Sequence, residues 1–153
     1  MTSASRLPFY LATILLLSGC GLYWSQFGPE LHLYDGLREA HEVATIDQGL
    51  GCSACVRTIR RFDQKAPIYV LPPTRYRPAG VQFDRPNKII VLPGKYEMIL
   101  GFTGTPLWVG YVELQPGHTY EVLNKLFTGV TSTKTFVWME DAETGEVLLG
   151  EKM

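Results

Sequence analysis

From residue 42 onward, apolar and polar positions follow one another in short runs that are separated by turn residues. Alternation is clearest over Tyr96–Phe102, where every second residue is apolar, and it returns over Thr119–Val122. A period of two places neighbouring side chains on opposite faces of a strand, so the pattern predicts an all-β domain. The predicted strands are Glu42–Ile46, Val56–Phe62, Ile68–Leu71, Lys88–Leu92, Tyr96–Phe102, Leu107–Leu114, Thr119–Asn124, Thr133–Glu140 and Glu146–Leu149. The helical spacing of Cys55, Ile59 and Phe62 leaves a short helix as the alternative to the second strand.

Turn residues stand between these runs. Pro93-Gly94 and Pro116-Gly117 fit type II turns, because Pro fixes its own φ and Gly accepts a positive one. Asp141–Gly145 forms a third corner before the last strand. Short strands joined by tight turns predict one antiparallel β-sandwich over residues 41–153, Ig-like or prealbumin-like, with about seven to nine strands.

The first 19 residues have a different pattern. Arg6 is followed by the apolar run Leu7–Leu17 and then by small residues, which is the pattern of an export signal. The run is too short for a spanning helix, which needs about 20 apolar residues. We therefore expect residues 1–19 to be a signal peptide.

Leu17-Ser18-Gly19-Cys20 resembles the bacterial lipobox. The resemblance implies that Cys20 carries a thioether-linked diacylglycerol, that cleavage precedes it, and that its amine receives an acyl chain such as palmitate. An ordinary cleavable signal or a short anchor with an incidental cysteine is the alternative. The absence of Asp after Cys20 favours the outer membrane over the inner one, with the body in the periplasm. Residues 20–40 show no lasting period and contain several Gly and Pro, so we expect a tether there.

Several short motifs of the mature chain resemble a group of small bacterial lipoproteins. They are Tyr34-Asp35-Gly36, Glu42–Ile46, Leu92–Tyr96, Gln115–Tyr120 and Trp138–Val147. The resemblance implies a lipid-anchored all-β domain of uncharacterised function, and it supplies no catalytic residues. Function is therefore expected to be structural or based on interactions.

Cys52-Ser53-Ala54-Cys55 is the sharpest local motif. With Cys20 lipidated, two thiols remain in an oxidising compartment, which suits one disulfide that pins a turn. Thiol–disulfide exchange is an alternative, although the motif lacks the strand–helix context of thioredoxin-like sites. A second alternative is that the two cysteines bind a metal together with His32, His41 or His118. A third is that the two thiols are free or used separately.

The sequence contains no catalytic motif. Gly-x-Ser-x-Gly, His-Glu-x-x-His and phosphate-binding glycine loops are absent, and nothing indicates a cofactor. His118 opens a predicted strand as an ordinary polar edge residue. Glu140-Asp141 lies at a strand end, where solvation explains both carboxylates. We expect no enzyme and no metal site.

Charge is balanced overall but segregated along the chain. Fourteen Lys and Arg against fifteen Asp and Glu argue against a nucleic-acid binder. Arg57–Lys88 holds eight cations and two carboxylates, a net +6, whereas the chain from Glu140 onward carries a net −4. Arg75, Tyr76 and Arg77 lie in a proline-stiffened loop of the basic part. That loop is either a solvated edge or a contact for an anionic envelope polymer or an acidic envelope protein.

Overall fold

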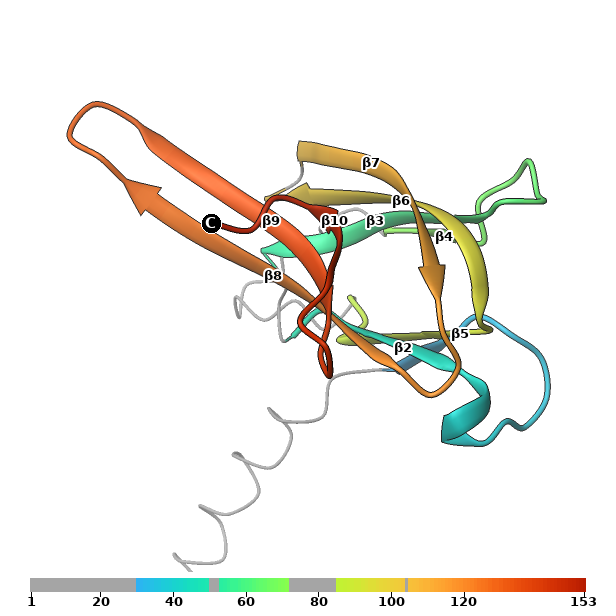
Figure 1. The fold of residues 1–153 in the computed structure, drawn as a ribbon. Coiled ribbons are helices and arrows are strands. Elements are labelled where there is room, and N and C mark those ends of the chain that lie inside the picture. The colour runs from blue at the N-terminus through green and yellow to red at the C-terminus, as the bar shows by residue number, and fades with distance from the viewer. Residues whose placement is uncertain (1–29, 50–52, 72–84, 104) are drawn as a thin grey trace, which may run out of the picture.

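The computed structural model describes residues 30–49, 53–71, 85–103 and 105–153, and these ranges form two β-sheets (Figure 1). The predicted all-β class is confirmed. The described ranges contain no α-helix, and their one helical turn is the 3-10 helix η1 (Ala40–Glu42). None of their segments forms a helix long and apolar enough to span a bilayer.

Six strands form the larger sheet. In spatial order they are β1 (Glu30–His32), β5 (Lys88–Val91), β2 (Ala44–Asp47), β8 (Thr119–Thr128), β9 (Thr133–Asp141) and β10 (Val147–Gly150). The prediction of a wholly antiparallel fold is wrong for this sheet, because β1 runs parallel to β5 and β2 runs parallel to β8. Turn residues report only how consecutive strands connect, whereas both parallel pairs join strands that are distant in the chain.

Four strands form the smaller sheet, which is antiparallel throughout. Its spatial order is β4 (Tyr69–Val70), β3 (Ala54–Arg61), β6 (Gly94–Phe102) and β7 (Thr105–Leu114). β3 begins one residue before Cys55 and continues to Arg61 as a regular strand with one bulge. The alternative of a short helix over Cys55–Phe62 is therefore excluded.

Each of the nine predicted strands overlaps an observed strand, from β2 to β10. The two Pro-Gly corners also lie where expected, and Gly94 and Gly117 both adopt positive φ. The missed strand is β1. It lies in the segment expected to be a tether, and Leu31 at its centre packs against the core.

The core lies between the two sheets and is built from their inward-facing side chains. The six-stranded sheet contributes Ile46, Tyr120 and Met139, among others, and the four-stranded sheet contributes Ile59 and Met98. All five are fully or almost fully buried. One continuous core joins the sheets into a single body.

β8 and β9 form a long hairpin that extends beyond the rest of the body (Figure 1). At its base, one row of paired residues crosses five strands of the larger sheet: Glu30, Lys88, Asp47, Glu121 and Glu140. β2 pairs with β8 only as far as Glu121. From there to the hairpin turn, the outer edge of β8 has no neighbouring strand among the described residues.

Candidate functional site

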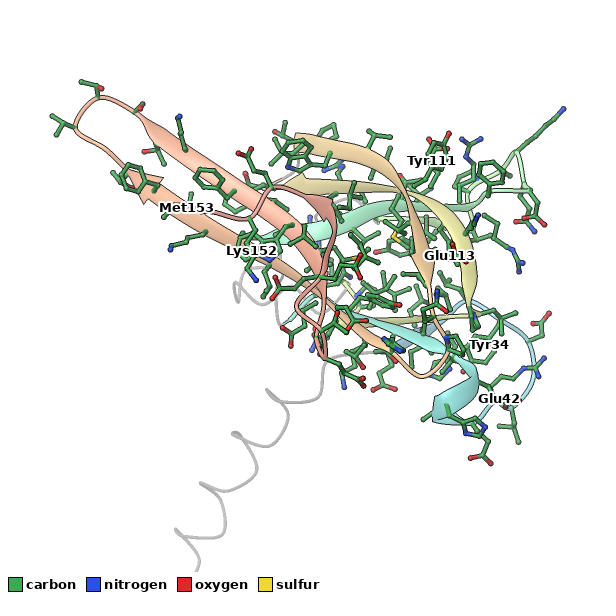
Figure 2. All side chains as sticks on the ribbon, in the orientation of Figure 1. Tyr34, Glu42, Tyr111, Glu113, Lys152 and Met153 are labelled. Atoms are coloured by element: carbon green, nitrogen blue, oxygen red, sulfur yellow. The ribbon has the colours of Figure 1, made fainter. Side chains whose placement is uncertain are left out.

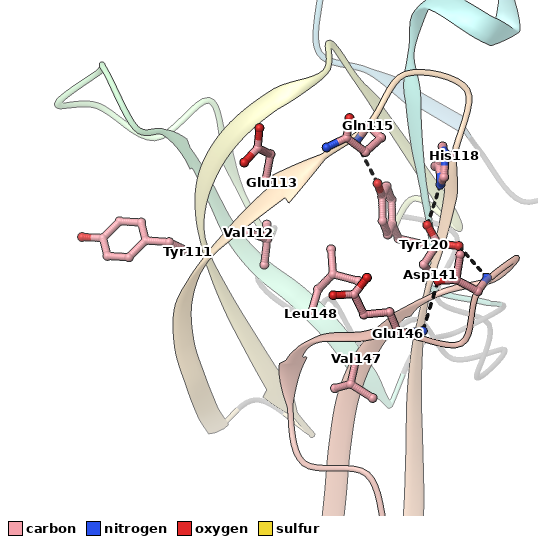
Figure 3. Close-up of a pocket in the computed structure, with 11 residues that line it drawn as sticks. Tyr111, Val112, Glu113, Gln115, His118, Tyr120, Asp141, Glu146, Val147 and Leu148 are labelled. Carbon is pink, nitrogen blue, oxygen red and sulfur yellow. Dashed lines mark hydrogen bonds and ion pairs between the residues drawn. The ribbon is translucent and has the colours of Figure 1, made fainter.

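A cleft of about 380 Å³ opens where the two sheets diverge, between the end of β7 and the β9–β10 turn (Figure 3). β7 and β10 are the outer strands of their sheets and do not pair with each other in the part of the chain that the structure describes. The side chain of Leu149 packs on Gly110 and closes this corner at one end. The residues lining the open end are Tyr111, Val112, Glu113, Gln115, His118, Tyr120, Asp141, Thr144, Glu146, Val147 and Leu148.

The turn from β7 to β8 fixes one side of the cleft. Gly117 takes a φ of 81°, and its amide donates to the carbonyl of Val43 at 2.7 Å, which docks the turn on the segment before β2. The Tyr120 hydroxyl accepts a 2.7 Å hydrogen bond from the Gln115 amide, so the turn is tied to the strand that follows it. Burial raises the pKa of Tyr120, and its hydroxyl stays protonated at neutral pH.

His118 and Asp141 form the polar centre of the cleft. Their side chains meet at 2.6 Å between Nδ1 and Oδ2, because strand pairing places Tyr120 opposite Asp141. The other oxygen, Oδ1, accepts the amides of Glu143 and Thr144 at 2.9 and 3.0 Å. The Asp141 carboxylate therefore organises the whole β9–β10 turn, as Asp often does at the first position of a turn.

These contacts shift both pKa values. The hydrogen bond to Asp141 is the main reason why the pKa of His118 is raised. Burial alone would raise the pKa of Asp141, but the hydrogen bonds from His118, Thr144 and Glu143 outweigh it and lower that pKa. At mildly acidic pH the two side chains therefore form a charge-assisted hydrogen bond. The Asp141 side chain is 7% exposed and the His118 side chain is 32% exposed.

The cleft presents mostly negative charge. Three of its lining residues are carboxylates, Glu113, Asp141 and Glu146, and His118 is its only basic residue. Glu113 has one neighbouring cation, Lys95, at 3.8 Å, and both side chains are exposed. This charge distribution is complementary to a cationic group.

The residues predicted from sequence are only partly within the described ranges. Cys20, Cys52, Arg75, Tyr76 and Arg77 lie outside them, so lipidation, the Cys52–Cys55 pairing and the loop contact stay predictions. Cys55 is buried in β3 and disulfide-bonded, and Arg85 Nη1 lies 3.7 Å from its sulfur.

The three histidines stand in three different settings. His32 contacts the Tyr34 hydroxyl at 2.9 Å, His41 lies in η1, and His118 binds Asp141. Within the described ranges, no group of three or more His, Cys, Asp or Glu side chains is arranged to hold a metal ion.

Three of the described cations of the basic segment form ion pairs with nearby carboxylates. Arg60 forms an ion pair with Glu97, and Arg61 contacts Asp63 at 3.5 Å. Lys88 lies 4.0 Å from Glu30 across the β1–β5 pair. These contacts favour the solvated-edge interpretation for this part of the segment.

Sequence reasoning missed His118 and Asp141 as a unit. The expectation that the Asp141 carboxylate is simply solvated is wrong. The carboxylate is buried, and both of its oxygens form hydrogen bonds within the protein. The signal available was an Asp at the start of a five-residue corner that ends in Gly145, which is typical of a side-chain-capped turn.

Comparison of the chain with protein-family models, with curated proteins and with solved structures gives no match.

Proposed function

We propose that this chain is a lipid-anchored protein of the bacterial cell envelope whose β-domain binds a partner and catalyses no reaction. The observation that carries the binding role is the acidic cleft, whose His118–Asp141 pair is committed to holding two turns together. The anchor is supported by Leu17-Ser18-Gly19-Cys20 and by the resemblance to small bacterial lipoproteins. The absence of Asp after Cys20 favours the outer membrane, with the body in the periplasm.

The two packed sheets support a finer classification as an Ig-like or prealbumin-like sandwich. The parallel β1–β5 and β2–β8 pairs distinguish it from the purely antiparallel members of that class. The Cys52–Cys55 motif is proposed as a structural clip. The burial of Cys55 and its disulfide favour this role over thiol exchange or metal binding.

The partner that suits the cleft is an extended cationic segment. The outer edge of β7 offers backbone groups to a strand laid against it, and Glu113 and Glu146 stand on opposite sides of the opening (Figure 3). Main-chain pairing with a sheet edge supplies affinity, and side-chain charges supply selectivity. An alternating Lys-Val peptide is the simplest probe of this chemistry.

The anchor is tested by growing cells with an alkyne-tagged palmitate and measuring the intact mass of the purified protein. We expect label and diacylglycerol mass on the wild type and neither on Cys20→Ser. Label that persists on Cys20→Ser would contradict lipidation at this residue.

The cleft is tested by titrating the purified mature protein with the alternating Lys-Val peptide at low salt. The double variant Glu113→Gln/Glu146→Gln should weaken binding about tenfold, since two surface carboxylates at about 0.7 kcal/mol each contribute about 1.4 kcal/mol together. Glu121→Gln is the matched control, because Glu121 lies on the larger sheet away from the cleft lining. Equal affinity for all three proteins would refute the cleft as the binding site.

A further inference from the structure

The far end of the β8–β9 hairpin is uncovered on both faces. Leu126 and Phe127 are consecutive, so they point to opposite faces of the hairpin, yet each is 53% exposed. Val130 in the turn is fully exposed. Exposed apolar side chains gathered at one end of a domain mark a contact site.

One face of the hairpin combines aromatic and cationic side chains. Strand pairing places Phe127 opposite Lys134 and Lys125 opposite Phe136. Leu123 and Trp138 continue the same face toward the body. The C-terminal residue Met153 lies alongside, and it lines a hollow of about 270 Å³ with Phe127, Ser132, Lys134 and Phe136 (Figure 2).

Charge on the hairpin has one sign. Between Glu121 and Glu140 the only charged residues are Lys125 and Lys134. Lys152, which follows β10, lies at the base of this face, where its amine is 6.0 Å from the Trp138 ring and forms an ion pair with Glu140 at 2.5 Å. Aromatic rings interleaved with lysines form the chemistry of a lipid interface, because lysine stems cover apolar groups while their amines reach anionic headgroups.

We propose that the end of the β8–β9 hairpin inserts into the lipid bilayer and forms a second membrane contact. Leu126, Phe127 and Val130 enter the headgroup–acyl boundary, and Lys125 and Lys134 bind anionic headgroups. This proposal rests on the lipid anchor at Cys20, which brings the domain to the membrane.

The position at which the chain enters β1 supports a membrane as the binding partner of the hairpin end. Glu30 is the first residue of β1 and shares a row with Glu121, and β1 runs antiparallel to β8. The chain therefore enters the larger sheet from the end toward which the hairpin projects. Thr128 lies seven residues beyond that row, about 23 Å along the strand. The ten residues from Cys20 to Glu30 reach at most about 35 Å, so one membrane plane can meet both the anchor and the hairpin end.

Photocrosslinking tests the contact in the lipidated mature protein, reconstituted into vesicles of equal parts phosphatidylethanolamine and phosphatidylglycerol that contain an alkyne-tagged lipid. Phe127→benzoylphenylalanine places the photoreactive group on the hairpin. Phe62→benzoylphenylalanine is the matched control, since Phe62 is also exposed but lies just after β3 of the other sheet. We expect about tenfold more lipid adduct from position 127 than from position 62.

A second substitution, combined with the probe at position 127, tests whether the exposed turn takes part in the contact. Val130→Asp places a charge at a fully exposed turn residue, where folding is not at risk. It should reduce lipid adducts from position 127 about fivefold, whereas Val109→Asp on the outer strand β7 should not.

The outcomes separate the two proposals. A lipidated protein whose position 127 crosslinks to a second copy, to another protein or to nothing overturns the hairpin contact and leaves the anchor intact. A protein whose mass shows no lipid overturns the anchor, whatever the hairpin does.

Discussion

Gly150 shows how one residue sets the end of the domain. It adopts a φ of 94°, and a Cβ built there would lie 2.2 Å from the carbonyl oxygen of Val137. Neither the backbone conformation nor the close approach to β9 accepts a side chain.

We predict that Gly150→Ala lowers the free energy of unfolding by about 2 to 4 kcal/mol, from strain and from the clash with backbone. Urea unfolding measures it. Gly36→Ala is the control, because Gly36 also has positive φ but its Cβ would meet nothing within 4 Å, so it should cost only about 1 kcal/mol. Equal losses in the two variants would contradict the packing argument.

The His118–Asp141 pair makes stability depend on pH in a defined direction. The raised pKa of His118 gives a contribution that is fully present below the ordinary value of 6.5 and is lost as pH rises through the raised pKa. The lowered pKa of Asp141 acts at the other end. Its contribution is present above the ordinary value of 3.8 and is lost as pH falls through the lowered pKa.

The free energy of unfolding should therefore decline as the pH rises above 6.5, and urea midpoints measured across that range test this. His118→Gln removes the titrating group and should flatten the decline. His41→Gln, at an exposed position in η1, should retain the wild-type profile. An unchanged slope in His118→Gln would show that other groups cause the pH dependence.

At the scale of elements, the described strands were largely predictable and the site was not. β6 shows why the strands were: its alternation repeats over four apolar residues, and Pro93-Gly94 marks its start. β1 lacked any such signal, because three residues with one apolar side chain have no detectable period. Its existence depends on β5, more than fifty residues later in the chain.

The candidate site could not be predicted from local sequence for a similar reason. His118 and Asp141 are 23 residues apart, and only the pairing of β8 with β9 brings them together. Local patterns carry no information on such a contact. The contact between His118 and Asp141 follows from the register of a long hairpin, which no turn motif specifies.

β1 can be tested as a part of the domain. Leu31→Asn should lower the free energy of unfolding by about 1 to 2 kcal/mol, because Leu31 packs against the core. Leu37→Asn, at a fully exposed residue, is the matched control and should have no measurable effect in urea unfolding. If both variants unfold like the wild type, β1 contributes nothing to the stability of the domain.

At the scale of the whole molecule, the shared core predicts that both sheets unfold together. Ile46 belongs to the larger sheet and Ile59 to the smaller one, and both are completely buried in one cluster. Separate unfolding would expose each sheet's inner face to water.

Two of the three tryptophans report on the sheets, Trp108 in β7 and Trp138 in β9, and every variant also carries Trp24→Phe so that each signal is read separately. Ile46→Ala should lower stability by about 2 to 5 kcal/mol. The loss should shift the fluorescence midpoint equally in Trp108→Phe and Trp138→Phe backgrounds. Two different midpoints would show that the sheets are independent units.

The parallel pairing of β1 with β5 also decides how the domain bears mechanical load. A pull on the chain upstream of Glu30 acts along β1, whereas the hydrogen bonds to β5 lie across that direction. The bonds are therefore strained together in shear and cannot be opened one after another. A strand of only three residues therefore transmits the load to the larger sheet through all its hydrogen bonds at once. These bonds must break before the core is exposed.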